Sequence, residues 1–387
     1  MKNGNPFSPT FPVNPNYFAN REEILSSFRT AFDRSIKTEM PTPDNIAILG
    51  NCGTGKTSVL RKFEAIALEE FKDRKVFSAI VEFTPANCNS FSSIFGKVVE
   101  DISGNFITNT TVSTEIKNEI KNWRVESIKE WRMDSGQKSK DEPSLVVAKD
   151  MFIALWEILE KLGVDTTLLM LDDLHHATNK YPDVLKYMKT VFQGLAKHGC
   201  NFMVVITGKR GLFSDVRMFD GPFANFFNIR HSLNPFNLNG VRDAISKPLK
   251  LSGLDLTVKD EVIEKIHHLT KGYPIFINFV MRELVSLKEH GRIDLRFLEK
   301  NYDVIERIME KEAFKEDFLR ASHKEREILL SMAKLSERFK PSDINIANAR
   351  TQLRFLLKKG LILRHDRGEY SLYHPLFREY LGGMGKK

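Results

Sequence analysis

The chain has 387 residues, of which 42% are hydrophobic and 28% charged, and its formal net charge is +8. This length predicts two or three domains, and the ordinary composition excludes collagen-like and disordered classes. The cysteines Cys52, Cys88 and Cys200 form no C-x-x-C pair, no stretch approaches the roughly 18 apolar residues of a membrane span, and 1–10 lacks the apolar core of a signal peptide. We therefore expect a cytoplasmic protein without a zinc site or a disulfide framework.

The first motif lies at 50–57 and follows an apolar run at 45–49 that is typical of a strand. It reads G-N-C-G-T-G-K-T and fits G-x-x-x-x-G-K-[ST], the phosphate-binding loop of nucleoside triphosphatases. Glycines let the backbone N–H groups curl around phosphates, Lys56 would bind the β- and γ-phosphates of ATP, and the Thr57 hydroxyl would bind Mg²⁺. The helix expected after the loop would point its N-terminus at the anion. The expected nucleotide contacts are Gly50, Asn51, Cys52, Gly53, Thr54, Gly55, Lys56, Thr57 and Ser58.

Further strand-like runs alternate with helical stretches along the first 235 residues. The strands are expected at 76–83, 167–171, 202–207 and 227–233. This alternation predicts an α/β fold, a P-loop parallel sheet with helices on both faces. A mostly helical insert is expected at 90–163, with a polar loop at 134–143.

Two adjacent carboxylates, Asp172 and Asp173, end the strand expected at 167–171. Asp172 would hold Mg²⁺, and Asp173 would orient or deprotonate the water that attacks the γ-phosphate. A second aspartate has a shorter reach than the commoner glutamate, which suggests slow, switch-like hydrolysis. Thr207, at the end of the next strand, either presents its hydroxyl to the γ-phosphate or simply caps the strand.

Four basic or imidazole side chains that follow these motifs in the sequence are weaker candidates for a catalytic or metal-binding role. Arg210 and Arg217 could act as an arginine finger toward a neighbouring subunit or be ordinary surface residues. His175 and His176 follow the acidic pair without other spaced metal ligands, so we interpret them as loop residues.

The pattern becomes helical after 235. Helices at 239–251, 259–270 and 274–290 predict a small helical lid, and a polar helical bridge is expected at 294–317. Helices at 324–334, 341–346 and 347–359, then strands at 361–364 and 369–373 joined at Asp366-Arg367-Gly368, predict a winged helix. The expected domains are the ATPase domain at 1–235, the lid at 236–293, a linker at 294–320 and the winged helix at 321–387.

Most of the positive charge lies in the winged helix. Residues 321–387 contain 14 Lys or Arg against 7 Asp or Glu, a net charge of +7. On the helix expected at 347–359, Arg350, Arg354 and Lys358 recur every four residues and form one stripe. Candidate DNA contacts are Arg350, Gln352, Arg354 and Lys358 on this helix, with Arg364 and Arg367 in the wing.

Several of these motifs together resemble the archaeal ATPase family of the STAND and AAA+ group, which is related to origin-recognition-type initiators. The resemblance rests on the opening box at 16–23 (N-Y-F-A-N-R-E-E), the phosphate loop, the acidic pair, Thr207, the turn at 233–236 (L-N-P-F) and the K-G-Y-P at 271–274. It implies that Asn20 and Arg21 lie near the adenine and that Pro274 touches the nucleotide from the lid. The sensor arginine that initiators carry after the corresponding glycine is missing here, which favours the STAND side.

Two functions remain open at this point. The chain is expected to be a magnesium-dependent ATPase that acts as a nucleotide-dependent switch, binding double-stranded DNA through the winged helix. Alternatively, it is a signalling or scaffold ATPase whose winged helix binds a protein partner and which forms homo-oligomers with ATP. The affinity for DNA would fall steeply as the salt concentration rises, because phosphate contacts release counterions. Binding to a protein partner has no reason to show this dependence.

Overall fold

The structure is a computed structural model that describes residues 4–37, 43–108, 113–137, 145–181, 183–213, 225–288 and 290–384. The chain forms two compact units. The first, which we call the sheet unit, comprises Arg21–Gly50 and Gly55–Asn234. The second, the C-terminal unit, comprises Met1–Asn20, Asn51–Thr54 and Pro235–Lys387. None of the helices in the described ranges is long and apolar enough to cross a membrane.

A five-stranded parallel sheet forms the centre of the sheet unit, in the order β2-β3-β4-β1-β5. The α/β prediction is therefore confirmed. Strand β1 pairs with β4 and β5, and in register Leu49 lies opposite Gly208, so the phosphate loop begins where β4 ends. Because parallel strands end at the same edge, the ends of β1, β3 and β4 bring distant segments together. The strands are β1 (Ile46–Gly50), β2 (Val76–Glu82), β3 (Thr166–Asp172), β4 (Phe202–Gly208) and β5 (Ile229–Leu233).

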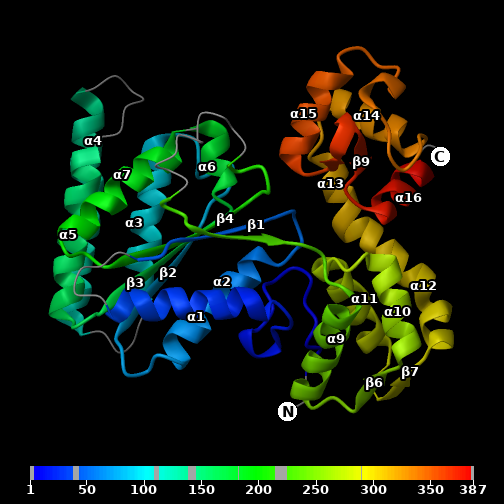
Figure 1. Ribbon diagram of the computed structural model, residues 1–387, viewed down its shortest axis with the longest axis horizontal. Coiled ribbons are helices and arrows are strands. Elements are labelled where there is room, and N and C mark those ends of the chain that lie inside the picture. Colours follow the sequence, from blue (N-terminus) through cyan, green and yellow to red (C-terminus); the bar gives the residue numbers. More distant parts are fainter. Residues whose placement is uncertain are drawn as a thin grey trace. The chain divides into compact units, whose positions relative to one another are not determined.

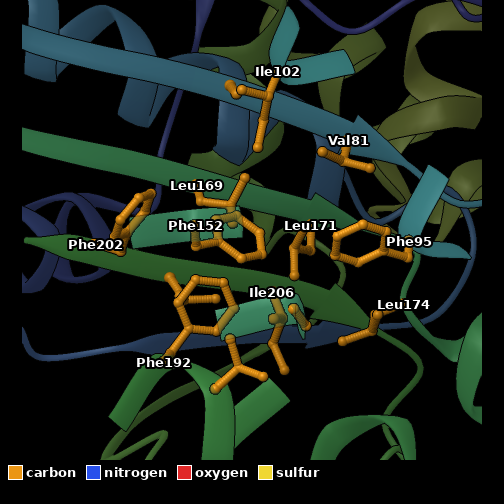
Figure 2. Packing of buried hydrophobic residues seen from close by; sticks show 14 of the residues in the cluster. Val81, Phe95, Ile102, Phe152, Leu169, Leu171, Leu174, Phe192, Phe202 and Ile206 are labelled. Atoms are coloured by element: carbon orange, nitrogen blue, oxygen red, sulfur yellow. The ribbon is translucent and has the colours of Figure 1, made fainter. Parts of the chain in front are cut away.

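Helices cover both faces of this sheet, with α1 and α2 on one face and α3, α5 and α7 on the other (Figure 1). Figure 2 shows Phe95, Phe152 and Phe192 packed over Leu169 and Leu171 on the second face. The alternate residues of β3 are buried as well, as expected for a central strand covered on both sides. The helices are α1 (Glu22–Lys37), α2 (Lys56–Glu69), α3 (Phe91–Thr108), α4 (Thr114–Gln137), α5 (Leu145–Lys161), α6 (His175–Lys180) and α7 (Val184–Lys197).

The helical insert is present, but the prediction of a loop at 134–143 is wrong for 134–137. Helix α4 continues through Gln137, and 138–143 lie outside the described residues. The prediction used polarity alone, and polar residues do not end a helix while the backbone hydrogen bonds continue and no proline interrupts them.

The C-terminal unit starts with the helices expected for a lid, and it also contains two short strands that we did not predict. Strands β6 (Leu256–Val258) and β7 (Gly291–Ile293) pair in parallel, which shortens the third helix to Leu287. The helical bridge is present and includes a π-helical turn at Glu310–Phe314. The helices of this part are α9 (Leu238–Ser252), α10 (Asp260–Thr270), α11 (Pro274–Leu287), α12 (Leu295–Met309) and α13 (Lys315–Leu319).

The last part of this unit has the helices and antiparallel hairpin expected of a winged helix, with two differences. The helix expected at 341–346 is only a 3₁₀ turn at Pro341–Asp343, because the backbone of Ile344 is extended (φ −93°, ψ +106°) and stops the helix there. An additional helix, α16 (Pro375–Met384), follows the hairpin. The other elements are α14 (His323–Ala333), α15 (Ala349–Lys359), β8 (Ile362–Arg364) and β9 (Tyr370–Leu372).

One hydrophobic core runs through the whole C-terminal unit. Phe314 of the π-helical turn lies 5.4 Å from the Phe276 ring of α11 and 5.8 Å from the Phe377 ring of α16. His374, only 1% exposed, lies at the same junction with its Nε2 3.0 Å from the carbonyl oxygen of Thr270. The lid helices and the hairpin region are therefore packed as one body.

His374 is expected to make this junction sensitive to acid. Its Nδ1 accepts from Leu376 N at 3.2 Å, so the ring is neutral with the proton on Nε2. Burial lowers the pKa of His374 to about 4, whereas the unfolded chain titrates at 6.5. The unfolded state binds the proton more readily, so the stability contribution is complete above pH 6.5 and is lost as the pH falls toward 4, by about 3 kcal/mol in all.

Hydrogen–deuterium exchange of α11 and α16 amides at pH 7, 5.5 and 4.5, corrected for intrinsic exchange rates, measures this loss. His374→Gln should flatten the pH dependence, whereas the exposed His268→Gln should leave it unchanged. An unaltered pH dependence in the His374 variant would rule out this residue as the cause.

Candidate nucleotide site

The end of β3 and the start of α2 form a hydrogen-bonded cluster within the sheet unit. Thr57 Oγ1 donates to Asp172 Oδ2 at 2.6 Å, and Thr207 Oγ1 donates to Asp172 Oδ1. Asp172 is 2% exposed and Thr207 is fully buried. A hydroxyl and a carboxylate on adjacent elements are the hard oxygen ligands that Mg²⁺ prefers. The structure thus brings the two predicted metal ligands together, although they are 115 positions apart.

Asp173 lies beside them in an unusual backbone conformation. Its φ is +50°, a left-handed value that is costly for a residue other than glycine. The conformation is held because Asp173 N donates to Thr207 Oγ1 at 2.8 Å and to Asp172 Oδ1 at 3.1 Å. Asp173 Oδ1 in turn lies 3.4 Å from Lys56 Nζ. The cluster therefore combines a cation, two carboxylates and two hydroxyls, all within the sheet unit.

The two carboxyls differ in their electrostatic environment. Burial and the charge of Asp173 raise the pKa of Asp172, against the hydrogen bonds from Thr207 and Thr57. For Asp173 burial also opposes ionisation, but the ammonium of Lys56 together with the neighbouring His175 and His176 outweighs it and lowers the pKa. Adjacent carboxyls with pKa values shifted in opposite directions are typical of functional sites.

The phosphate loop has the backbone conformation that its glycines predict. Gly53 and Gly55 have φ values of +76° and +90°, which L-residues rarely adopt. Helix α2 begins directly afterwards at Lys56, with Gly55 in the N-cap position and no side-chain cap. Because uncapped N–H groups at a helix start attract anions, this end of α2 suits a phosphate. Cys52 is exposed in the same loop.

The other predicted nucleotide contacts are only partly connected to this cluster. Arg21 has a left-handed φ of +74°, and its guanidinium donates to the carbonyl oxygen of Asn234. Asn20 and Pro274, which begins α11, belong to the C-terminal unit, so their approach to an adenine or phosphate remains a prediction.

The arginine-finger candidates receive no support from the described residues. Arg210 donates to the Leu233 carbonyl at 3.2 Å and to Asn234 Oδ1, which keeps its guanidinium at the end of β5 of its own chain. Arg217 lies outside the described residues. Both assignments remain predictions.

The predicted DNA contacts lie on the surface of the C-terminal unit. Arg350, Arg354 and Lys358 are exposed along α15, whose Leu353 and Leu356 are buried. Gln352 is half-buried, whereas Arg364 and Arg367 are exposed on the hairpin. Arg367 has a left-handed φ of +59° at the turn. The expected basic stripe is thus an accessible face of a packed helix.

Sequence reasoning missed His175. We interpreted it as a loop residue, but the structure buries it as the first residue of α6, with its Nδ1 3.6 Å from Asp173 Oδ1. Burial and the nearby charge of Lys209 lower its pKa to about 3, so the ring is neutral. A metal role remains unsupported, because no cluster of three or more His, Cys, Asp or Glu side chains suited to a metal occurs in the described part of the chain.

Comparison with known proteins shows which solved structures share this fold. No protein-family model matches the chain, and no curated protein sequence matches it. Solved structures do match along nearly the whole length, and they have the fold of P-loop ATPases of the archaeal origin-recognition type.

Three of these structures illustrate the likeness. The Walker-type ATPase PABY2304 of Pyrococcus abyssi is 17% identical, with a TM-score of 0.59 over 94% of this chain and 96% of that chain. The ORC2 protein of Aeropyrum pernix, solved as ADPNP–ADP complexes, is 12% identical, with a TM-score of 0.61 over 95% and 93%. The ORC1 protein of the same organism, solved in complex with DNA, is 15% identical, with a TM-score of 0.51 over 95% and 94%. The fold expected from the sequence resemblance is therefore confirmed.

Proposed function

We propose that this protein binds and hydrolyses ATP and uses the nucleotide as a switch. The observation that carries the proposal is the cluster of Lys56, Thr57, Asp172, Asp173 and Thr207 at the start of α2, which follows the left-handed Gly55 of the phosphate-loop motif. The fold shared with Walker-type and origin-recognition ATPases supports it.

Each side chain has a role that fits its position. Lys56 would bind the β- and γ-phosphates, leaving Asp173, with which it pairs at 3.4 Å. Thr57 and Asp172 would hold Mg²⁺, whose charge neutralises the phosphates when it is bound. Asp173 would orient the attacking water, and Thr207 would fix both aspartates through its hydroxyl. Thr207 thereby supports the carboxylates in addition to any contact with the γ-phosphate.

We further propose that the winged helix at 321–387 binds double-stranded DNA. The proposal rests on the exposed stripe of Arg350, Arg354 and Lys358 on α15, which would contact the DNA. Neighbouring contacts would come from Gln352, Arg364 and Arg367. A helix with one buried apolar side and one exposed basic side can enter a major groove while its arginines contact phosphates. The DNA complex of the similarly folded ORC1 protein is consistent with this proposal.

Titration of fluorescently labelled duplex DNA at several salt concentrations, in Mg-ADP and in a non-hydrolysable Mg-ATP analogue, tests the DNA proposal. Reversing the charge at Arg350, Arg354 and Lys358 should weaken binding by roughly 100-fold and make the salt slope shallower by about 0.9 for each phosphate that is no longer neutralised. The matched control reverses the exposed Lys121, Lys129 and Lys186 of the sheet unit, which changes net charge equally. Equally weakened binding in both triple variants would mean that general charge, and not this stripe, attracts DNA.

The second candidate is a signalling or scaffold ATPase whose winged helix binds protein. Phe355 on α15 favours it, because this aromatic ring is 46% exposed next to the basic stripe. Absence of salt-dependent DNA binding in both nucleotide states would support this alternative. ATP-dependent homo-oligomers, measured by light scattering, would support it further.

A further inference from the structure

His175 occupies a position that the proposed roles do not use. It is the first residue of α6, two positions after Asp173, and is only 7% exposed. Its ring lies 4.1 Å from that of His176, which limits how far it can turn. An imidazole buried this deeply at the end of the acidic strand needs a polar partner or costs stability.

The facing atoms of His175 and Asp173 are both unsatisfied. Nδ1 of His175 and Oδ1 of Asp173 are 3.6 Å apart, both are buried, and neither forms a hydrogen bond of good geometry within the described residues. The same Oδ1 also lies 3.4 Å from Lys56 Nζ. Asp173 Oδ1 thus faces both Lys56 and His175. Bound phosphates would attract the Lys56 ammonium away from this oxygen, whereas the His175 ring would stay in place.

The backbone of Asp173 cannot adjust when Lys56 moves, because its N–H group is bound to Thr207 Oγ1 and Asp172 Oδ1. Only the side-chain torsions are free, and an aspartate has a short reach. A second donor at a fixed place is what would stop the carboxylate from turning once the ammonium leaves.

We propose that His175 is a positioning residue for Asp173: when Lys56 engages the nucleotide, Nδ1–H of His175 donates to Asp173 Oδ1 and leaves Oδ2 facing the attacking water. This role rests on the proposed ATPase function. His175 does not touch the nucleotide or the metal in this scheme, and its contribution is the direction of one carboxylate.

Three substitutions distinguish the donor position from simple packing. His175→Asn places an amide N–H close to the position of Nδ1, His175→Gln places it near Nε2, and His175→Phe keeps the ring without a donor. We expect kcat to fall about 10- to 100-fold in the Gln and Phe variants, the decrease typical of residues that orient a catalytic group, and to stay within about threefold in the Asn variant. The exposed His198→Asn is the control and should hydrolyse ATP like the parent.

A binding measurement gives a readout that is independent of turnover. Mg-ADP should bind all variants within about threefold of the parent, whereas Mg-ADP with fluoroaluminate, which mimics the phosphoryl group and requires an ordered water, should bind the Gln and Phe variants at least about tenfold more weakly. Parent-like kcat in His175→Phe would overturn the proposal. An equal decrease of kcat in the Asn and Gln variants would also overturn the proposal. The comparison of these two variants decides the question even if the Phe variant does not fold. Failure of the parent itself to bind ATP would instead contradict the proposed function.

Discussion

Replacing Lys56 with alanine is expected to weaken ATP binding at least about 100-fold and to abolish hydrolysis, since charge-assisted hydrogen bonds to phosphate contribute about 1.5–3 kcal/mol each. Lys56 is 9% exposed at the start of α2, so water cannot replace it easily. The same change leaves Asp173 without its ion-pair partner, and the carboxylate that should direct water loses the charge that favours its ionised form.

Isothermal titration with Mg-ATP and phosphate release at saturating ATP measure the two effects separately. Lys62→Ala is the matched control, because it removes the same charge from the same helix away from the loop. Parent-like affinity in the Lys56 variant would show that the phosphate loop is not the nucleotide site.

The second large effect is expected at Gly272, in the K-G-Y-P segment before α11. Its φ is +73°, and an added Cβ would lie 2.0 Å from the carbonyl oxygen and 2.9 Å from the carbonyl carbon of Phe236. These are backbone atoms fixed by the hydrogen bond from Phe236 N to the Gly272 carbonyl at 2.7 Å, so they cannot move aside. Gly272→Ala should therefore destabilise the C-terminal unit by about 3–5 kcal/mol, combining left-handed strain with overpacking.

Gly360 provides a control with the same backbone strain. Its φ is also +73°, yet an added Cβ would have no atom within 4 Å. Gly360→Ala should cost only about 1 kcal/mol, as expected for the left-handed conformation alone. Denaturant unfolding monitored by hydrogen exchange of the C-terminal unit compares the two variants. Similar destabilisation in both would mean that the close approach to Phe236 contributes nothing.

The sequence predicted the parts of the site that depend on spacing along one element. The glycine pattern and the acidic pair predicted what lies at the ends of β1 and β3, because each depends on local chain geometry. His175 could not be assigned in the same way, since its role depends on burial and on the direction of a ring against Asp173. Its one signal was an imidazole two positions after the acidic pair, and that pattern does not distinguish a buried side chain from a loop.

The errors in the predicted fold also concern features that leave no local pattern in the sequence. Strands β6 and β7 are three residues each and pair segments about 35 positions apart, so neither shows a periodic pattern of its own. The predicted helix at 341–346 contained too few residues for periodicity to separate an α-helix from a 3₁₀ turn. Helix α16 follows the hairpin directly, in a segment for which the sequence pattern predicted no element.

The common core of the C-terminal unit determines how this protein can be dissected. Cutting the chain near 320 would uncover Phe276, Thr270 and Phe314, which now contact His374 and Phe377. Apolar rings and a carbonyl group would face water, so the shortened chain would be prone to aggregate and the excised piece would lack part of its interior. Truncation therefore cannot test nucleotide binding and the proposed DNA binding separately, and surface substitutions on α15 are the appropriate tool.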